Sequence, residues 1–389
     1  MQMTPAACVR HACRYLVATI GLASLACAPA GAAIPRSDLL VASGWNETDH
    51  TSRIVRVDPA TGEQSLVSDN ATSLMAGGQP LFQDVTGIYQ QPGTTGYALV
   101  TSGEDRDNTG RIIRVSTVNG RQELISDNAR SAAAGGIQAL GMPHGLAMTP
   151  DGSGDIVVAN TNLAAAAVDQ GTILRIDAST GRQTLLSDDA KSAARGGDQD
   201  FARGEPMDVA IGLDDAYYAA VCDPENPVIK VDPGSGKQTT VTDAAISARS
   251  GGEDALRCAD GIAVSRSGDL VVADATNRVV AVDPSTGAQR TVTSAGELDD
   301  PHAVGVVAAT GHVDGEVVVV NEGTDDGTGT LLAVDPVTGT QSEISSNGIS
   351  ALAGGGRLFA RPFDITQELF PPPPPAPLLG INGPPGAPH

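Results

Sequence analysis

The sequence predicts an all-β protein, a β-propeller of six four-stranded blades whose first blade is closed by a strand from near the C-terminus. Three observations predict this architecture. One eleven-residue motif recurs six times, successive copies begin 51 to 61 residues apart, and a strand that the first repeat lacks is present near the end of the chain. A repeat of this length is typical of one propeller blade.

The repeated motif predicts the third and fourth strands of each blade. In each copy, alternating apolar residues lead into a turn such as Asp-Pro-x-Thr-Gly, and a second β-rich run follows, as in a hairpin. The turn glycine permits the positive φ that such a turn requires. The six copies begin at Ile54, Ile112, Ile173, Val228, Val279 and Leu331.

Two further strands are predicted upstream of the motif. The second strands begin at Asp38, Gly96, Asp155, Ala216, Asp269 and Glu316. The innermost strands are expected at residues 82–86, 143–147, 206–210, 259–263 and 301–305. The first repeat has no such segment before it, but residues 362–366 match the pattern. We therefore expect 362–366 to pair beside 38–43, which closes the ring and removes an open sheet edge.

Five of the six linkers between blades carry a second repeat, for example at residues 126–136 and 187–197. A Ser or Thr, an Ala-rich run and a terminal Gly-Gly predict a short capped helix in each. The linker from Thr293 to Asp300 lacks the pattern, so we expect no helix there.

The ends of the chain differ from the propeller, which is predicted for residues 34–370. Residues 1–33 have the features of a signal peptide, with Arg10 and Arg14 before an apolar run and small residues after it. Acylation at Cys27, as in a lipoprotein, is the less favoured alternative. Residues 371–389 are rich in Pro and Gly, which predicts a disordered tail. We expect a secreted or periplasmic protein without a transmembrane span.

Composition limits the classes of function. The formal net charge of −22 argues against nucleic acid as a partner, and the aromatic content of 3% argues against a stacking surface for long glycans. Motifs of serine hydrolases, zinc proteases and phosphate-binding loops are missing from the sequence. We expect a monomer that binds a small molecule or a protein partner.

The mouth of the central channel is the candidate site. The innermost strands of a propeller begin together at one mouth, so residues at their second and third positions should meet there. These positions hold His144, His302, Asp84, Asp208, Asp260 and Asp364. The four Asp could bind one divalent ion (Ca²⁺, Mg²⁺ or Zn²⁺), with the two His as catalytic residues. Alternatively, each Asp accepts backbone hydrogen bonds between blades and each His fills space through a hydrogen bond.

Two acidic loops are candidate calcium sites. Residues 105–110 have the spacing with which a calcium loop begins, but Ser116 stands where the bidentate acid belongs. We interpret this loop, and the acidic loop at 321–327, as polar hairpin loops.

Cys222 and Cys258 are the two cysteines outside the predicted signal peptide. Cys222 ends the second strand of blade four and Cys258 precedes the innermost strand of blade five, so the topology brings them to one face. We expect a disulfide in an oxidising compartment, with free thiols or a soft-metal ligand pair as alternatives.

The blade pattern P-x-G-[IL]-A, D-G-x-[IL]-V-V-A-[DN], I-x-R-[VI]-D-P-x-T-G resembles NHL-repeat propellers and the related gluconolactonase and senescence-marker-like group. The resemblance implies a six-bladed propeller over nearly the whole chain after residue 33. It also implies a divalent metal at the channel mouth and a lactonase activity, although the E-G-P-x-W signature that supplies the group's Glu ligand is missing. The segment 143–145, Pro-His-Gly, is similar to one in streptogramin lyases, and peptide-amidating lyases are six-bladed NHL relatives with zinc.

Two functions follow from these observations. The first is an exported propeller that binds a small molecule or a protein partner at its channel mouth. The second is a metal-dependent hydrolase of the lactonase kind, or a lyase, with its site at the same mouth.

Overall fold

The computed structural model describes residues 38–44, 51–90, 96–103, 109–162, 170–201, 204–307, 316–323 and 327–367. All of them belong to one compact unit, residues 36–389. The predicted signal peptide (1–33), residues 105–108 of the first acidic loop, residues 324–326 of the second and the tail at 371–389 lie outside the described residues. No helix in the described chain is long and apolar enough to cross a membrane.

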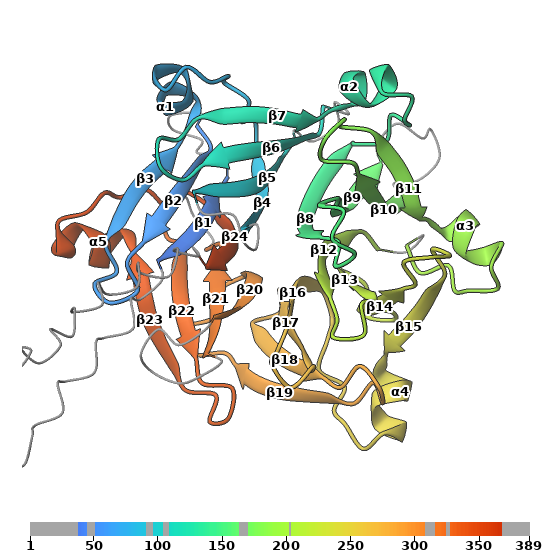
Figure 1. Cartoon of the computed structure of the whole chain (residues 1–389). Helices are drawn as coiled ribbons and strands as arrows, with labels where there is room; N and C mark the ends of the chain where they lie inside the picture. The colour runs from blue at the N-terminus through green and yellow to red at the C-terminus, as the bar shows by residue number, and fades with distance from the viewer. Residues whose placement is uncertain are drawn as a thin grey trace, which may run out of the picture. The chain divides into compact units, whose positions relative to one another are not determined.

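Six antiparallel sheets of four strands stand around a central channel, which Figure 1 views end-on. The predicted six-bladed propeller is therefore confirmed. From the channel outward, blade 1 contains β24 (Pro362–Gln367), β1 (Leu39–Ser43), β2 (Arg53–Val57) and β3 (Gln64–Ser68); blade 2 contains β4 (Val85–Gln90), β5 (Tyr97–Ser102), β6 (Arg111–Ser116) and β7 (Gln122–Ser126); and blade 3 contains β8 (Met142–Met148), β9 (Ile156–Asn162), β10 (Gln170–Ile176) and β11 (Gln183–Ser187).

The second half of the ring repeats this order. Blade 4 contains β12 (Pro206–Ile211), β13 (Tyr217–Val221), β14 (Val228–Val231) and β15 (Gln238–Thr242); blade 5 contains β16 (Ala259–Val264), β17 (Leu270–Asp274), β18 (Arg278–Val282) and β19 (Gln289–Ser294); and blade 6 contains β20 (Pro301–Val307), β21 (Glu316–Asn321), β22 (Thr330–Val334) and β23 (Gln341–Ser346). The middle strands are rich in buried β-branched residues because both faces of a blade pack against neighbouring blades.

The strand β24 closes the ring as the sequence predicts. It pairs antiparallel with β1, in a register that sets Ile365 opposite Val41. The N–H of Gly44 extends this pairing by donating to the carbonyl of Arg361 at 2.8 Å. Blade 1 is therefore built from both ends of the propeller sequence, and its β1 edge is paired.

The innermost strand of blade 2 corrects one expectation. It was expected at 82–86, but β4 begins at Val85, which pairs with Ser102. Because Val85 pairs with Ser102 as Pro143 of β8 pairs with Asn160, Thr86 takes the position in β4 that His144 takes in β8. Asp84 lies one residue before the strand and not at its third position.

A hydrogen bond that recurs in the linkers explains this register. The hydroxyl of Ser102 accepts the N–H of Gln83 at 2.9 Å, as the side-chain oxygen of Asn160 accepts the N–H of Gly141 at 3.0 Å. The donor residue stands two positions before Val85 in blade 2 and two positions before its counterpart Pro143 in blade 3. Phe82, buried at 5% exposure, is the apolar anchor of the linker and not the first residue of the strand.

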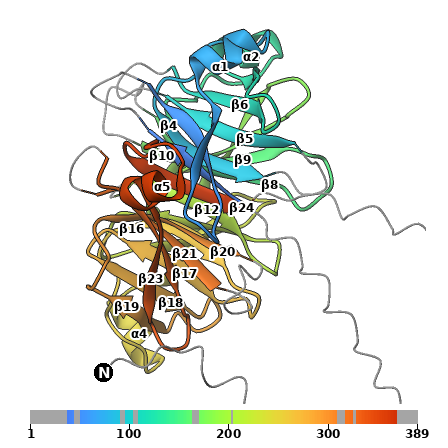
Figure 2. The same ribbon diagram turned by 90° about the vertical axis from the view of Figure 1, so that its left-hand side faces the viewer.

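Helices occupy five linkers, and the linker at 293–300 has none, as predicted. They are α1 (Asn70–Met75), α2 (Asn128–Ala133), α3 (Asp189–Ala193), α4 (Ala244–Arg249) and α5 (Asn347–Ala353). Figure 2 shows α1 and α2 at one edge of the ring and α4 at the opposite edge. The expected Ser or Thr cap is corrected in four helices, where an Asp caps instead. Asp127, for example, accepts the N–H of Arg130 at 2.7 Å.

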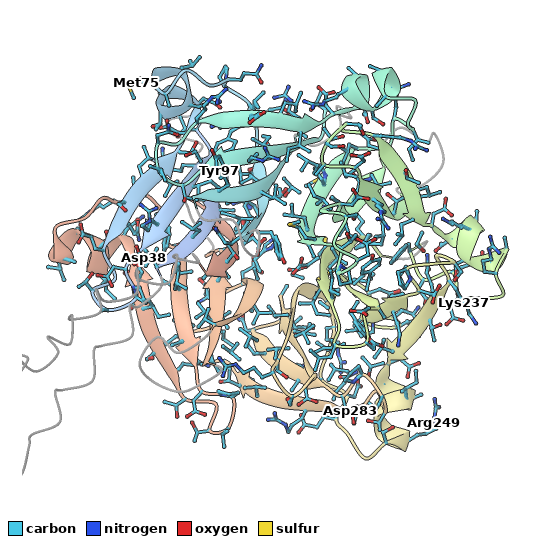
Figure 3. The ribbon with its side chains drawn as sticks, viewed as in Figure 1. Asp38, Met75, Tyr97, Lys237, Arg249 and Asp283 are labelled. Atoms are coloured by element: carbon cyan, nitrogen blue, oxygen red, sulfur yellow. A yellow bond between two sulfur atoms is a disulfide. The ribbon has the colours of Figure 1, made fainter. Side chains whose placement is uncertain are left out.

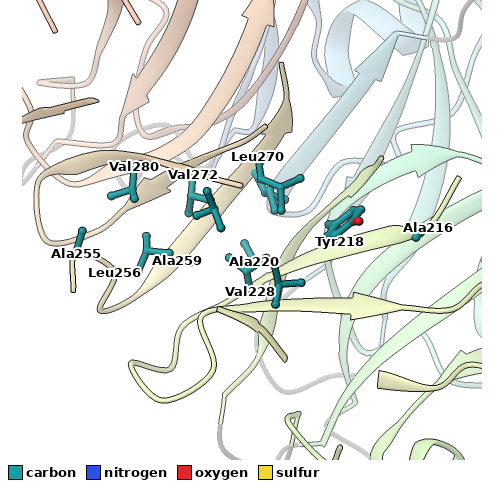
Figure 4. Packing of buried hydrophobic residues seen from close by; sticks show 13 residues of the cluster. Ala216, Tyr218, Ala220, Val228, Ala255, Leu256, Ala259, Leu270, Val272 and Val280 are labelled. Carbon is teal, nitrogen blue, oxygen red and sulfur yellow. The ribbon is translucent and has the colours of Figure 1, made fainter. Parts of the chain in front are cut away.

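The apolar core lies between neighbouring blades, and charged side chains lie on the rim. Figure 4 shows Tyr218 and Val228 of blade 4 facing Leu270 and Val272 of blade 5. All four are buried. In Figure 3, Lys237 and Arg249 lie at the outer edge of the ring. This separation of apolar and charged residues stabilises the contacts between blades by burial.

A buried glutamine joins each of the five linkers that contain a helix to the blade that follows. Gln183, with 1% exposure, accepts the N–H of Ala139 at 2.8 Å through Oε1. Its Nε2 donates to the hydroxyl of Ser126, and its own N–H donates to the hydroxyl of Ser131. Equivalent glutamines with the same three bonds stand at positions 64, 122, 238 and 289.

Candidate functional site

The six innermost strands enclose a cavity of about 280 Å³ along the channel axis. Its walls are mostly aliphatic, with Val209, Ile262 and Val304 among the lining residues. Two carboxylates, those of Asp208 and Asp364, also line it. They come from blades 4 and 1, which stand on opposite sides of the ring. The cavity is therefore an apolar chamber with a pair of acidic groups.

Both carboxylates form hydrogen bonds between blades. Asp208 accepts the N–H of Ile262 in the next blade at 2.9 Å, and Asp364 accepts the N–H of Ile88 in the next blade at 2.8 Å. The second oxygen of each accepts the N–H of the residue that follows it, at 2.7 Å in both cases. The alternative that these Asp serve as acceptors between blades is confirmed for this pair.

The two carboxylates also perturb each other. Burial raises the pKa of Asp208 to about 6, against the donated N–H bonds that lower it. Burial and the charge of Asp208 raise the pKa of Asp364 well above its usual range. Two negative charges in an apolar chamber repel each other, so a proton or a cationic group between them would be stabilised.

His144 and His302 approach the mouth from blades 3 and 6. His144 is buried, with its Nε2 3.4 Å from the hydroxyl of Thr161. The side chain of His302 is 20% exposed, and its ring packs at right angles to the ring of Phe363, with 4.7 Å between the ring centroids. Burial is the main cause that lowers the pKa of both imidazoles to about 4, and for His144 repulsion from a protonated His302 is part of the cause. Both are therefore neutral at pH 7.

An ion pair beside His302 was not predicted from the sequence. Arg361 pairs with the carboxylate of Glu322, which is only 7% exposed and lies 3.8 Å from Nε2 of His302. The guanidinium of Arg361 also lies over the ring of Phe363, 5.5 Å from its centroid. Glu322 follows the second strand of blade 6, and Arg361 precedes the closing strand. Their positions next to strand ends at the same mouth are the signal that could have identified them.

The predicted disulfide between Cys222 and Cys258 is confirmed. It lies beside Asp260, whose Oδ1 is 3.8 Å from Sγ of Cys258. Burial raises the pKa of Asp260 to about 8, and the charges of Asp300, Asp274 and Glu322 add to this effect. Asp300 itself has a raised pKa, through burial and the charge of Glu322. The side of the mouth between blades 5 and 6 is thus strongly acidic.

The six predicted site residues lie in several places around the mouth. Asp208 and Asp364 share the channel cavity, Asp260 lies beside the disulfide, and Asp84 lies with the Phe363 ring next to Gly44. Within the described ranges, Cys222, Cys258 and Asp260 are the one group in which three Cys, His, Asp or Glu ligand atoms lie within 4.8 Å of one another. The four predicted Asp therefore do not converge on one point in this structure.

Comparison with known proteins relates the chain to other propellers. No protein-family model matches it, and no curated protein matches it either. A chain of the nidogen/laminin complex is similar over 86% of this chain and 98% of its own length, with 15% identity and a TM-score of 0.56. TolB from Acinetobacter baumannii is similar over 85% of this chain and 66% of its own, with 13% identity and a TM-score of 0.53. At these identities the similarity shows the fold alone.

A virginiamycin B lyase from Staphylococcus aureus, crystallised as an inactive variant with quinupristin, covers 85% of this chain and 92% of its own length. Its identity of 13% and TM-score of 0.47 are too low to carry an argument about function.

Proposed function

We propose that this protein is a binding propeller whose ligand is a small molecule that enters the channel mouth and presents a cationic or hydrogen-donating group to Asp208 and Asp364. The observation that carries the proposal is the position of these two carboxylates in one apolar cavity of about 280 Å³. A concave, mostly apolar pocket with a few converging polar groups is the usual form of a small-molecule site. The volume suits a ligand of modest size.

The electrostatics of the pair support this choice of ligand. Burial and the charge of Asp208 raise the pKa of Asp364, which means that ionising both carboxylates together is unfavourable. A positive group bound between them would offset this repulsion. The aliphatic walls, which include Val209 and Val304, would contact an apolar body attached to that group. An ammonium group on a short hydrocarbon skeleton fits both requirements.

Thermal shift with a matched panel tests the proposal. Primary amines, alcohols and carboxylates of the same carbon skeletons would be compared on the wild type and on an Asp208→Asn, Asp364→Asn double variant. We expect the amines to raise the melting temperature of the wild type, the carboxylates to have no effect, and the double variant to lose the response. Glu123→Gln, on the exposed face of β7, is the matched control. A response that survives in the double variant would contradict the proposal.

Acid–base catalysis of the lyase kind is the second candidate. It is favoured by two neutral imidazoles, His144 and His302, and by the carboxylate of Glu322 at 3.8 Å from the second of them. A lactonase-like metal centre fits less well, because Asp84, Asp208, Asp260 and Asp364 do not offer a common set of donor atoms. Metal analysis of the wild type and of a His144→Ala, His302→Ala variant tests the metal-dependent form. Stoichiometric metal that the variant loses while it stays folded would favour the enzyme.

We also propose that the protein acts outside the cytoplasm, as a secreted or periplasmic monomer. The predicted signal peptide and the Cys222–Cys258 disulfide support this location, since disulfides persist in oxidising compartments. Detection of the mature protein in a periplasmic or culture-medium fraction tests it.

A further inference from the structure

The Cys222–Cys258 disulfide has a third ligand atom beside it. The two Sγ atoms and a carboxylate oxygen of Asp260 all lie within 4.8 Å of one another. Cys222 is exposed, Cys258 is partly exposed, and Asp260 is 8% exposed. A reductant could therefore reach the disulfide from solvent, whereas the carboxylate is held inside the protein.

The backbone holds these residues in place independently of the disulfide. The N–H of Cys258 donates to the carboxylate of Asp274 at 2.9 Å, and the carbonyl of Cys258 accepts the N–H of Ala275 at 3.0 Å. The N–H of Cys222 reaches the carbonyl of Glu205 at 3.4 Å. Cleavage of the disulfide would therefore leave both side chains next to Asp260.

The surroundings favour a cation at this point. The carboxylates of Asp300, Asp274 and Glu322 act on Asp260 as like charges. A divalent ion bound to Asp260 would relieve that repulsion. Two thiolates and one carboxylate are a donor set that suits Zn²⁺, and a water molecule would complete the tetrahedron.

We propose that Cys222, Cys258 and Asp260 form a redox-gated zinc site, which assembles when a dithiol reduces the disulfide and is abolished when the disulfide re-forms. In the first step the dithiol gives two electrons and two protons to the Cys222–Cys258 bond and itself becomes a disulfide. In the second step Zn²⁺ binds both sulfur atoms and the carboxylate of Asp260, and each of the two thiols, together with the Asp260 carboxyl group where it is protonated, releases its proton to solvent.

The two cysteine side chains need to move little to bind zinc. Zn–S bonds of about 2.3 Å in a tetrahedral site place two sulfur atoms about 3.8 Å apart, so rotation of the two side chains is sufficient. Because the ligands come from blades 4 and 5, the ion would replace the disulfide as the link between those blades. The proposal does not depend on a ligand in the channel cavity.

The test uses the full-length protein before and after reduction with dithiothreitol, followed by removal of the reductant without oxygen. Cd²⁺ serves as the probe because its bonds to thiolates give a charge-transfer absorption that carboxylates alone do not. We expect one equivalent of Cd²⁺ with this absorption in the reduced protein and none in the oxidised protein. Competition with Zn²⁺ should remove the absorption.

Variants separate the site from a general acidic surface. Cys222→Ser should abolish the absorption, and Asp260→Asn should weaken binding at least tenfold, on the order of the loss seen when a metal site loses a supporting group. Asp300→Asn removes a neighbouring charge without removing a ligand, and should weaken binding much less. The proposal is overturned if the reduced protein binds no Cd²⁺, if it unfolds by circular dichroism on reduction, or if Asp260→Asn and Asp300→Asn bind alike.

Discussion

The carboxylate of Asp364 accepts the backbone N–H of Ile88 at 2.8 Å, across 276 residues of sequence. Asp364 lies on the closing strand β24, and Ile88 lies on the innermost strand of the next blade. Asp208 makes the equivalent bond to Ile262 in the opposite half of the ring. Closure of the ring and assembly of the channel carboxylates therefore depend on the same strand.

Replacement of Asp364 by Ala should destabilise the ring. The N–H of Ile88 would lose its acceptor inside the protein, which costs about 1–3 kcal/mol. We expect this loss in the free energy of unfolding, measured in urea. Glu123→Ala removes an exposed carboxylate from β7 and should change little. If both variants lose the same free energy of unfolding, the hydrogen bond from Ile88 to Asp364 does not stabilise the protein.

Removal of β24 should have a larger effect than any single change in it. A chain that ends at residue 360 leaves β1 without its antiparallel partner and leaves an open edge at blade 1. We expect a lower melting temperature and a broader unfolding transition than for a chain that ends at residue 370, which retains the strand. If the two proteins melt alike, β24 does not contribute to closure in solution.

The pH dependence of stability should reveal the carboxylate pair. Burial raises the pKa of Asp208 from 3.8 to about 6, so the folded protein binds more protons than the unfolded chain between these values. The stability that Asp208 contributes is therefore lost as the pH rises through about 6. Relative to the wild type, Asp208→Asn should gain up to about 3 kcal/mol between acidic and neutral pH.

The wild type has to be compared with Asp208→Asn because the two histidines change the stability with pH in the direction opposite to Asp208. Burial lowers the pKa of His144 and His302 to about 4, so their contribution to stability is lost as the pH falls below about 6.5. The difference between wild type and Asp208→Asn in urea unfolding removes this shared contribution. A difference that does not vary with pH would contradict the raised pKa of Asp208.

The sequence was sufficient to predict the ring because its signals are local and repeated. Turn residues and strand periodicity recur in six copies, and each copy predicts the same hairpin. The error at Asp84 arose because residues 82–86 resemble the innermost-strand segments of other blades, with an apolar residue first and an aliphatic residue fourth. The register of β4 is instead set by a contact that is not local, the hydroxyl of Ser102 on the N–H of Gln83.

The site was predictable only where it follows the repeat. Asp208 and Asp364 stand at the same register position of two blades, so alignment of the repeats brings them to one cavity. Glu322 and Arg361 stand next to strand ends where the other blades have different residue types, and they are 39 residues apart. Their ion pair depends on how blade 6 meets the closing strand, which the periodicity does not specify.

The buried glutamines should stabilise the fold more than Gln341, which takes the equivalent position in blade 6, where the linker has no helix. Gln183→Met would leave the N–H of Ala139 without its acceptor, at about 1–3 kcal/mol, whereas the N–H of Leu140 would keep its bond to Oδ1 of Asn128. Gln341 is partly exposed, and its Oε1 accepts the N–H of Glu297, where water can substitute. We expect Gln341→Met to cost much less in urea unfolding. Equal costs would show that burial of the network is not what stabilises it.

The close approach of Gly145 to Asp208 gives a last prediction. A Cβ at Gly145 would lie 1.7 Å from Oδ1 of Asp208 and 2.9 Å from its Cα, so an alanine there must displace the carboxylate. Gly145→Ala should therefore disturb the bond from Asp208 to Ile262 and cost about 1–3 kcal/mol in overpacking. Gly234→Ala, with no atom nearer than 3.6 Å, is the matched control and should be neutral or slightly stabilising.

A double variant identifies the cause of that loss. If Gly145→Ala acts by displacing the Asp208 carboxylate, then Gly145→Ala added to Asp208→Ala should cost less than it does in the wild type, because only the 2.9 Å contact with the Cα of residue 208 remains. The two changes share one contact, so their effects on the melting temperature should not add. Additive effects would instead mean that the strain of Gly145→Ala lies in the backbone of β8. In that case the Asp208 carboxylate would not be the reason that this position requires glycine.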